Sequence, residues 1–207
     1  PRVSYTGNVR FATATQIPEM MDSEMFAKYF NAAGANSGNG VVFNDAAMKR
    51  ILAYKAGRSE KGDEFGTEWN DRDQNWALYN NAWANTNWFD EMYRKNAPTQ
   101  EHNLSVSGGT GNVNYYVSGA VLDQQGIIRH GSDLFKRYNL TAKMNIKILP
   151  WLTLGYTNRW TREEYSRPSY MTGLFFHNIA RRWPTNPVRD PNGYYVAGNE
   201  IIQMEDS

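Results

Sequence analysis

The sequence feature that most constrains this chain is a strict alternation of apolar and polar residues over residues 138–148. Successive side chains on a β-strand point to opposite faces, so a strand here would have one apolar face and one polar face. Its length is about what a tilted strand needs to cross a bilayer. A soluble antiparallel sheet with one hydrated face gives the same alternation, so the pattern alone leaves both kinds of strand open. The apolar positions are Tyr138, Leu140, Ala142, Met144, Ile146 and Ile148.

Composition narrows the class of protein. The 207 residues fit one domain or part of a large one, and 22 basic against 21 acidic residues give no reason to expect nucleic acid as a partner. Cysteine is absent, which excludes disulfides and thiol chemistry. No stretch approaches the roughly 18–20 apolar residues of a transmembrane helix, so membrane contact would be made by β-strands. The sequence shows no signal peptide and both ends look interrupted, so we expect a fragment of a longer polypeptide.

Alternation and turn residues predict five strands separated by segments of very different length. The strands are expected near residues 3–14, 101–108, 112–122, 137–148 and 151–162. Two long segments, 16–98 and 163–207, have mixed helical and loop character. Within them, Asp22 is a candidate helix N-cap and either Asn44 or Asp45 can cap a second short helix. Residues 31–40 are expected to be a Gly/Asn/Ala loop, and 170–181 is a short helical candidate.

The lengths of the connections favour a membrane barrel over a soluble sheet. Tight turns at 108–112 and 149–151 alternate with a medium loop at 123–137 and with the two long segments. Outer-membrane barrels have short periplasmic turns and long extracellular loops, whereas a soluble sandwich has no reason to collect its long loops at one end. We therefore predict a mainly β fold: an antiparallel up-and-down transmembrane β-barrel segment with long, partly helical extracellular loops.

Residues 100–109, QEHNLSVSGG, resemble the Q-x-H-N-L-S-V-S-G-G signature of the SusC/RagA family of TonB-dependent outer-membrane transporters. Blocks downstream (NYYVS, LDQQGII, FKRY and WL) match the same family with the same spacing, and the resemblance covers about residues 86–162. The signature residues are His102, Asn103, Leu104, Ser105, Gly108, Gly109, Asp123, Gly126 and Arg137.

The resemblance implies a function and a set of partners. Members of the family form a plugged 22-stranded barrel in the cell outer membrane and import large nutrients, here oligosaccharides or peptides. A SusD-like surface lipoprotein covers the barrel, and the TonB complex supplies energy through a TonB box near the N-terminus. This chain departs from the pattern because it has no TonB box, no plug domain and no later strands. About five strands of the barrel would be present, in contact with outer-membrane lipid.

Two groups of side chains are candidates for contacts. An aromatic cluster could stack on sugar rings or cover peptide side chains, although packing within the loop itself or against the lid protein is the favoured interpretation. Cations on the polar strand face would point to the lumen, because charge is costly on the lipid face, and would bond to the plug rather than to substrate. The aromatic candidates are Trp69, Trp76, Tyr79, Trp83, Trp88 and Trp183; the lumen candidates are Lys143, Lys147 and Arg159.

Nothing in the sequence predicts catalysis, a metal site or a cofactor. The adjacent carboxylates Glu163 and Glu164 point apart on an extended chain, and residues 71–75 lack the glycine and the distal glutamate of a calcium loop. We therefore expect a transporter rather than an enzyme. The alternative is a non-transporting β-rich surface protein that binds or adheres. The transporter interpretation fails if Leu140, Met144 and Leu154 lie beneath a second sheet or a helical layer.

Overall fold

The structure, a computed structural model, describes residues 1–168 and 173–196 and divides into two compact units. The first, here the sheet unit, comprises Pro1–Thr15 and Arg94–Pro168. The second, here the loop unit, comprises Gln16–Tyr93 and the described residues that follow Pro168.

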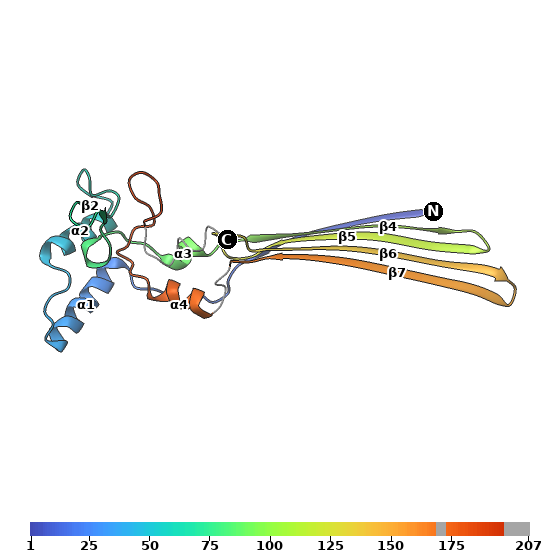
Figure 1. The fold of residues 1–207 in the computed structure, drawn as a ribbon, viewed down its shortest axis with the longest axis horizontal. Helices are drawn as coiled ribbons and strands as arrows, with labels where there is room; N and C mark the ends of the chain where they lie inside the picture. The colour runs from blue at the N-terminus through green and yellow to red at the C-terminus, as the bar shows by residue number, and fades with distance from the viewer. Residues whose placement is uncertain (169–172, 197–207) are drawn as a thin grey trace. The chain divides into compact units, whose positions relative to one another are not determined.

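The sheet unit is a five-stranded antiparallel sheet with the order β1-β4-β5-β6-β7 (Figure 1). Each strand pairs with the one that follows it in this unit, as in an up-and-down barrel. Only three residues join β4 to β5 and two join β6 to β7, so the long connections all leave from the opposite ends of the strands. The predicted antiparallel β architecture is confirmed. The strands are β1 Arg2–Ala12, β4 Ala97–Gly109, β5 Val113–Gln125, β6 Leu134–Leu149 and β7 Leu152–Ser166.

Several strands are longer at the loop end than the alternation predicts. β4 begins at Ala97 rather than near 101, β6 begins at Leu134 rather than near 137, and β7 continues to Ser166 rather than ending near 162. Backbone pairing continues there, since Leu134 is paired with both Gln125 and Ser166. Polar residues occupy both faces in this region, so side-chain periodicity stops before the ladder of hydrogen bonds does.

The register divides the sheet into two faces of opposite chemistry. In one row across the sheet, Val3, Val106, Val117 and Ala142 lie opposite one another, and these residues belong to the apolar face. In the next row Ser4, Ser105, Ser118, Thr141 and Arg159 lie together on the polar face. Asn158 is a polar residue in the middle of the apolar face, where its amide bonds the hydroxyl of Tyr156 at 3.3 Å.

Side chains on the apolar face of the sheet unit are exposed. Leu140, Met144 and Leu154 are 48%, 38% and 53% exposed. The observation that would have refuted a membrane strand, burial beneath a second layer, is not found among residues 1–168 and 173–196. Long strands with an uncovered apolar face are what a lipid-facing sheet requires.

The loop unit is built from short helices that begin where capping side chains occur. Asp22 accepts a hydrogen bond from the Met25 amide at the start of α1 (Ser23–Ser37), and Asn44 accepts one from Ala47 at the start of α2 (Asp45–Lys55). Both N-caps match the sequence prediction. The remaining elements are β2 Trp69–Asn70, β3 Asn75–Trp76, the 3-10 helix η1 Tyr79–Asn81, α3 Trp88–Met92 and α4 Gly173–Arg181.

One predicted boundary in the loop unit differs from the structure. The loop expected at 31–40 is wrong over most of its length, because α1 continues to Ser37 and ends at Gly38 in the left-handed conformation. Gly34 allows this, since a methyl group there would overlap the carbonyl oxygen of Gly40. The side chain of Asn31 bonds the backbone of Val42 and Phe43, which holds the returning chain against the helix. The helix predicted at 170–181 is α4, with residues 170–172 outside the described ranges.

The loop unit has a small hydrophobic core. Ala27, Phe43, Ile51 and Trp83 are almost fully buried together, and Trp183 packs against Phe26, Phe30 and Phe43 with ring centroids 4.6–5.8 Å apart. Within the described residues, no helix is long and apolar enough to cross a membrane.

Candidate functional site

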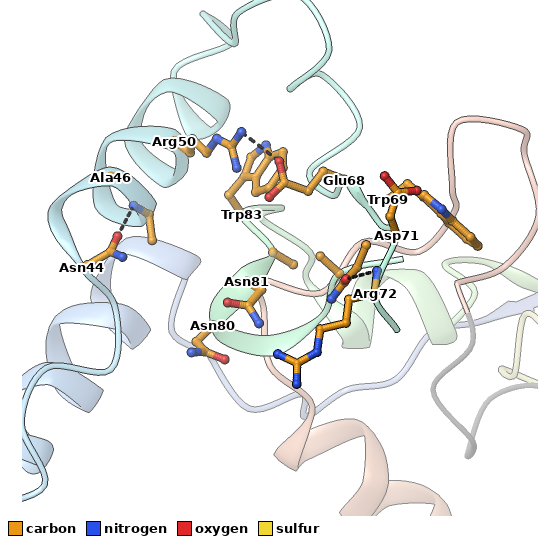
Figure 2. A pocket seen from close by; sticks show the side chains of 14 residues that line it. Asn44, Ala46, Arg50, Glu68, Trp69, Asp71, Arg72, Asn80, Asn81 and Trp83 are labelled. Atoms are coloured by element: carbon orange, nitrogen blue, oxygen red, sulfur yellow. Dashed lines mark hydrogen bonds and ion pairs between the residues drawn. The ribbon is translucent and has the colours of Figure 1, made fainter. Parts of the chain in front are cut away.

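The loop unit contains a cavity of about 600 Å³ between α2, the β2–β3 hairpin and η1 (Figure 2). Ligand pockets commonly have volumes of about 300–1,000 Å³, so this one is large enough for a small ligand. Its lining is half polar and half apolar, with several asparagines and charged side chains beside alanines and two tryptophans. The charged, aromatic and amide side chains that form its walls include those of Arg50, Glu68, Trp69, Asp71, Arg72, Asn80, Asn81 and Trp83.

Arg50 and Trp83 form a rigid part of the wall. The guanidinium of Arg50 lies 4.1 Å from the centroid of the Trp83 ring and bonds Glu68 at 2.9 Å and Asp63 at 3.2 Å. The hydrogen bond that Arg50 donates to Glu68, with both carboxylates nearby, raises the pKa of Arg50 despite some desolvation. The indole of Trp83 donates to the carbonyl of Asp63 at 2.8 Å, so the same loop holds both side chains.

The η1 wall depends on a strained backbone conformation at Tyr79. Tyr79 has φ of 59°, a left-handed conformation that side-chain-bearing residues rarely adopt. Its amide donates to the side chain of Asn186 at 2.6 Å, and its carbonyl accepts from the hydroxyl of Thr185 at 2.7 Å. Thr185 and Asn186 are 0% and 2% exposed. Strain of about 1–3 kcal/mol persists only where the surroundings fix it, and here it aims Asn80 and Asn81 at the cavity.

The hairpin wall is fixed by its own hydrogen bonds. The side-chain oxygen of Asn70 accepts from the amides of Arg72 and Asp73, and its amide group donates to Asp73 at 2.8 Å. Trp69 and Trp76 lie opposite each other in the pairing and meet edge to face, with ring centroids 5.3 Å apart. The hairpin therefore presents Trp69, which is 44% exposed, beside Asp71 and Arg72.

The aromatic candidates separate into two groups. Trp83 and Trp88 are buried at 2% and 5% exposure, and the Trp88 indole donates to the carbonyl of Trp183 at 2.9 Å. Tyr79 is half exposed but packs against Trp183 at 5.6 Å. Of the six, Trp69 and Trp83 line the cavity, with Trp83 acting mainly as core. Sequence reasoning missed Arg72, Asn80 and Asn81, whose only signal is the local abundance of asparagine.

The lumen candidates lie on the polar face of the sheet. Lys143 shares a row with Arg2 and Tyr116, and Arg159 lies opposite Thr141. Lys147 lies opposite Thr153 near the β6–β7 turn. Their neighbours are mostly small hydroxyl side chains, so this part of the polar face carries positive charge on a shallow surface.

Several signature residues have direct structural roles. Gly108 leaves room for the ring of Tyr115, and Gly126 leaves room for the carboxylate of Asp133, which accepts a hydrogen bond from Ile128. Asp123 pairs with Lys136 at 3.5 Å, and His102 bonds the hydroxyl of Tyr5 at 2.8 Å.

The other signature residues divide between the two faces. Leu104 belongs to the apolar face, whereas Asn103, Ser105 and Arg137 share the polar face, and Gly109 packs against Asn114. Much of the signature therefore specifies how β4, β5 and β6 pack rather than a ligand. No group of three His, Cys, Asp or Glu side chains suited to a metal ion occurs in 1–168 or 173–196.

A long antiparallel meander with one apolar and one polar face has the fold of a segment of an up-and-down β-barrel wall. The chain is 26% identical over 122 residues to the TonB-dependent receptor P26 of Formosa agariphila. It resembles the RagAB peptide transporter with a TM-score of 0.62 and 21% identity over 94% of this chain. The RagAB peptide importer in its closed-closed state gives a TM-score of 0.57 at 21% identity over 94% of this chain.

These comparisons confirm the resemblance to SusC/RagA-type TonB-dependent transporters at the level of a segment. The match to the receptor covers 58% of this chain and 12% of the relative, and the match to each RagAB structure covers 22% of that chain. No family model matches the chain.

Proposed function

We propose that this chain is part of an active transporter of the outer membrane that imports oligosaccharides or peptides with a SusD-like lipoprotein and the TonB complex. The supporting observation is the sheet, whose polar face suits a lumen and whose uncovered apolar face suits lipid. The similarity to a TonB-dependent receptor and to the RagAB peptide transporter supports the proposed uptake role.

The spacing of two exposed tryptophans supports this placement. Trp151, 80% exposed, lies in the β6–β7 turn, and Trp160, 50% exposed, lies nine residues later on the apolar face of β7. At about 3.4 Å per residue and a tilt of roughly 40°, they are about 23 Å apart along the membrane normal. Aromatic residues flank an apolar band about 25 Å tall in such barrels, so Trp151 and Trp160 would mark its two borders. The long loops, including the loop unit, would then be extracellular.

Cysteine scanning along β6 tests the placement of the sheet. This segment has no cysteine, so single substitutions Leu140→Cys, Thr141→Cys, Ala142→Cys and Lys143→Cys can be introduced in the full-length protein after any other cysteines are replaced. We expect a water-soluble maleimide to label positions 141 and 143 and to leave 140 and 142 unlabelled, because only the latter would contact hydrocarbon. Equal labelling of all four positions would refute the membrane barrel.

Uptake measurements test the transport role separately. Cells carrying the full-length protein should accumulate labelled oligosaccharide or peptide, and loss of the TonB complex should abolish accumulation but not surface binding. Surface binding without energy-dependent uptake would instead support a non-transporting surface binding or adhesion protein.

A further inference from the structure

We infer that the cavity of the loop unit is a binding site for a neutral saccharide, with Trp69 against the face of a sugar ring. This inference deepens the proposed function, on which it rests, because it selects one substrate class and names a place of capture. It is argued from the cavity's aromatic residue, its free polar groups, its charge balance and its lack of an extended strand edge.

The exposure and the packing of Trp69 suit it to contact with a sugar ring. A sugar ring has an apolar face of C–H groups and a rim of hydroxyls, so it suits a partly exposed aromatic ring beside polar side chains. Trp69 has such exposure, and its edge-to-face contact with Trp76 holds it in place before a ligand arrives. A side chain ordered in advance loses little conformational freedom on binding.

The cavity lining supplies free polar groups. Asp71, Arg72, Asn80 and Asn81 are exposed, and their side chains have no hydrogen-bond or ion-pair partner in the described part of the chain (Figure 2). Amides donate and accept, the guanidinium only donates and the carboxylate only accepts. Together they can satisfy sugar hydroxyls, which do both.

The charged side chains that line the cavity balance one another. The cavity is lined by two arginines and two carboxylates, namely Arg50, Arg72, Glu68 and Asp71, and Arg50 is already paired with Glu68. An anionic ligand would gain little net attraction from this balanced set. The lining therefore favours an uncharged ligand that hydrogen-bonds over an acidic peptide or an anionic glycan.

The hairpin beside the cavity is poorly suited to binding an extended peptide. Extended peptides commonly bind by adding a strand to a sheet edge. β2 and β3 have two residues each, so the hairpin beside the cavity offers no edge of useful length. Saccharide recognition needs no such edge.

Titration calorimetry on the full-length protein in detergent tests the inference. The probes are neutral hexasaccharides of glucose, xylose, mannose and galactose, with a tryptic digest of casein as the peptide probe. Trp69→Ala should weaken the binding of at least one hexasaccharide by roughly tenfold or more, since tryptophans dominate many interfaces. Trp69→Phe should restore part of the affinity, and Asn80→Ala with Asn81→Ala should also weaken binding. Tyr194→Ala is the matched control, because Tyr194 is 74% exposed in the same unit and does not line the cavity.

Other outcomes would refute either the saccharide site or the transporter proposal. If no hexasaccharide binds, or if Trp69→Ala binds as well as the parent protein, the saccharide site is refuted. If the digest alone binds and uptake depends on TonB, the saccharide site is refuted while the transporter proposal stands. If saccharide binding depends on Trp69 but the protein is absent from the outer membrane, the site stands and the transporter proposal fails.

Discussion

Arginine at Val117 should disrupt insertion of the barrel, whereas arginine at the adjacent Ser118 should be tolerated. Val117 is central on β5, 42% exposed, and lies in the apolar row with Val3, Val106 and Ala142. Ser118 lies on the polar face, in the row of small hydroxyl residues. Arginine on the lipid face near mid-depth costs about 2–4 kcal/mol. At about 1.4 kcal/mol per factor of ten, the folding equilibrium should fall by roughly thirtyfold to almost a thousandfold for Val117→Arg.

The assay compares the two variants of the full-length protein in lipid vesicles. Urea titration, followed by the mobility difference between heated and unheated samples on gels, gives the free energy of unfolding. Because the two positions are neighbours on one strand, the introduced arginine differs mainly in the face of the sheet that it occupies. Equal losses for both variants, or a larger loss for Ser118→Arg, would refute the assignment of the apolar face to lipid.

Three further predictions concern the loop unit of the full-length protein, each read by hydrogen exchange of the named element. Gly34→Ala should destabilise α1 by about 1–3 kcal/mol although alanine favours helices, because the methyl group would overlap the Gly40 carbonyl; unchanged protection would contradict this contact. Thr185→Val should loosen η1 by about 1–3 kcal/mol, since the Tyr79 carbonyl loses its hydroxyl partner, and α2 serves as the unaffected reference. The pKa of Asp22 is lowered by its bond to Lys55 and to the Met25 amide, so its stabilisation of α1 is full above the ordinary carboxyl pKa of 3.8 and is lost as pH falls through the lowered value. Asp22→Asn keeps a capping oxygen but should reduce the loss of α1 protection between pH 6 and pH 3, after correction for intrinsic exchange rates. If α1 protection in this variant changes with pH as it does in the parent protein, the Asp22 carboxylate is not the cause of the pH dependence.

The sheet was predictable because the sequence of each strand alternates between apolar and polar residues, which indicates the environment of each of its two faces. Tyr138 to Ile148 show one face apolar and the other polar without reference to any other strand. Helix starts at Asp22 and Asn44 were predictable for the same reason, since the cap and its amide lie within three residues. The loop end of β7 was not predictable, because its pairing with β6 outlasts the alternation.

The cavity could not be predicted because its walls depend on distant parts of the chain. Tyr79 is held by Asn186 and Thr185, which lie 107 and 106 residues away. No local pattern indicates a left-handed tyrosine, and none separates Trp69, which is exposed, from Trp83, which is core. The sequence favoured packing over ligand contact for the six aromatic candidates, and ligand contact stays a prediction for Trp69.

The bonds from Thr185 and Asn186 to Tyr79 also impose an order on biosynthesis. A ribosome that has just completed the first insertion has not yet made the residues that lock η1, and it makes all of β4 to β7 before it reaches them. The rim of the cavity therefore acquires its final geometry only after this stretch of barrel wall has been synthesised, so the binding surface matures after its scaffold.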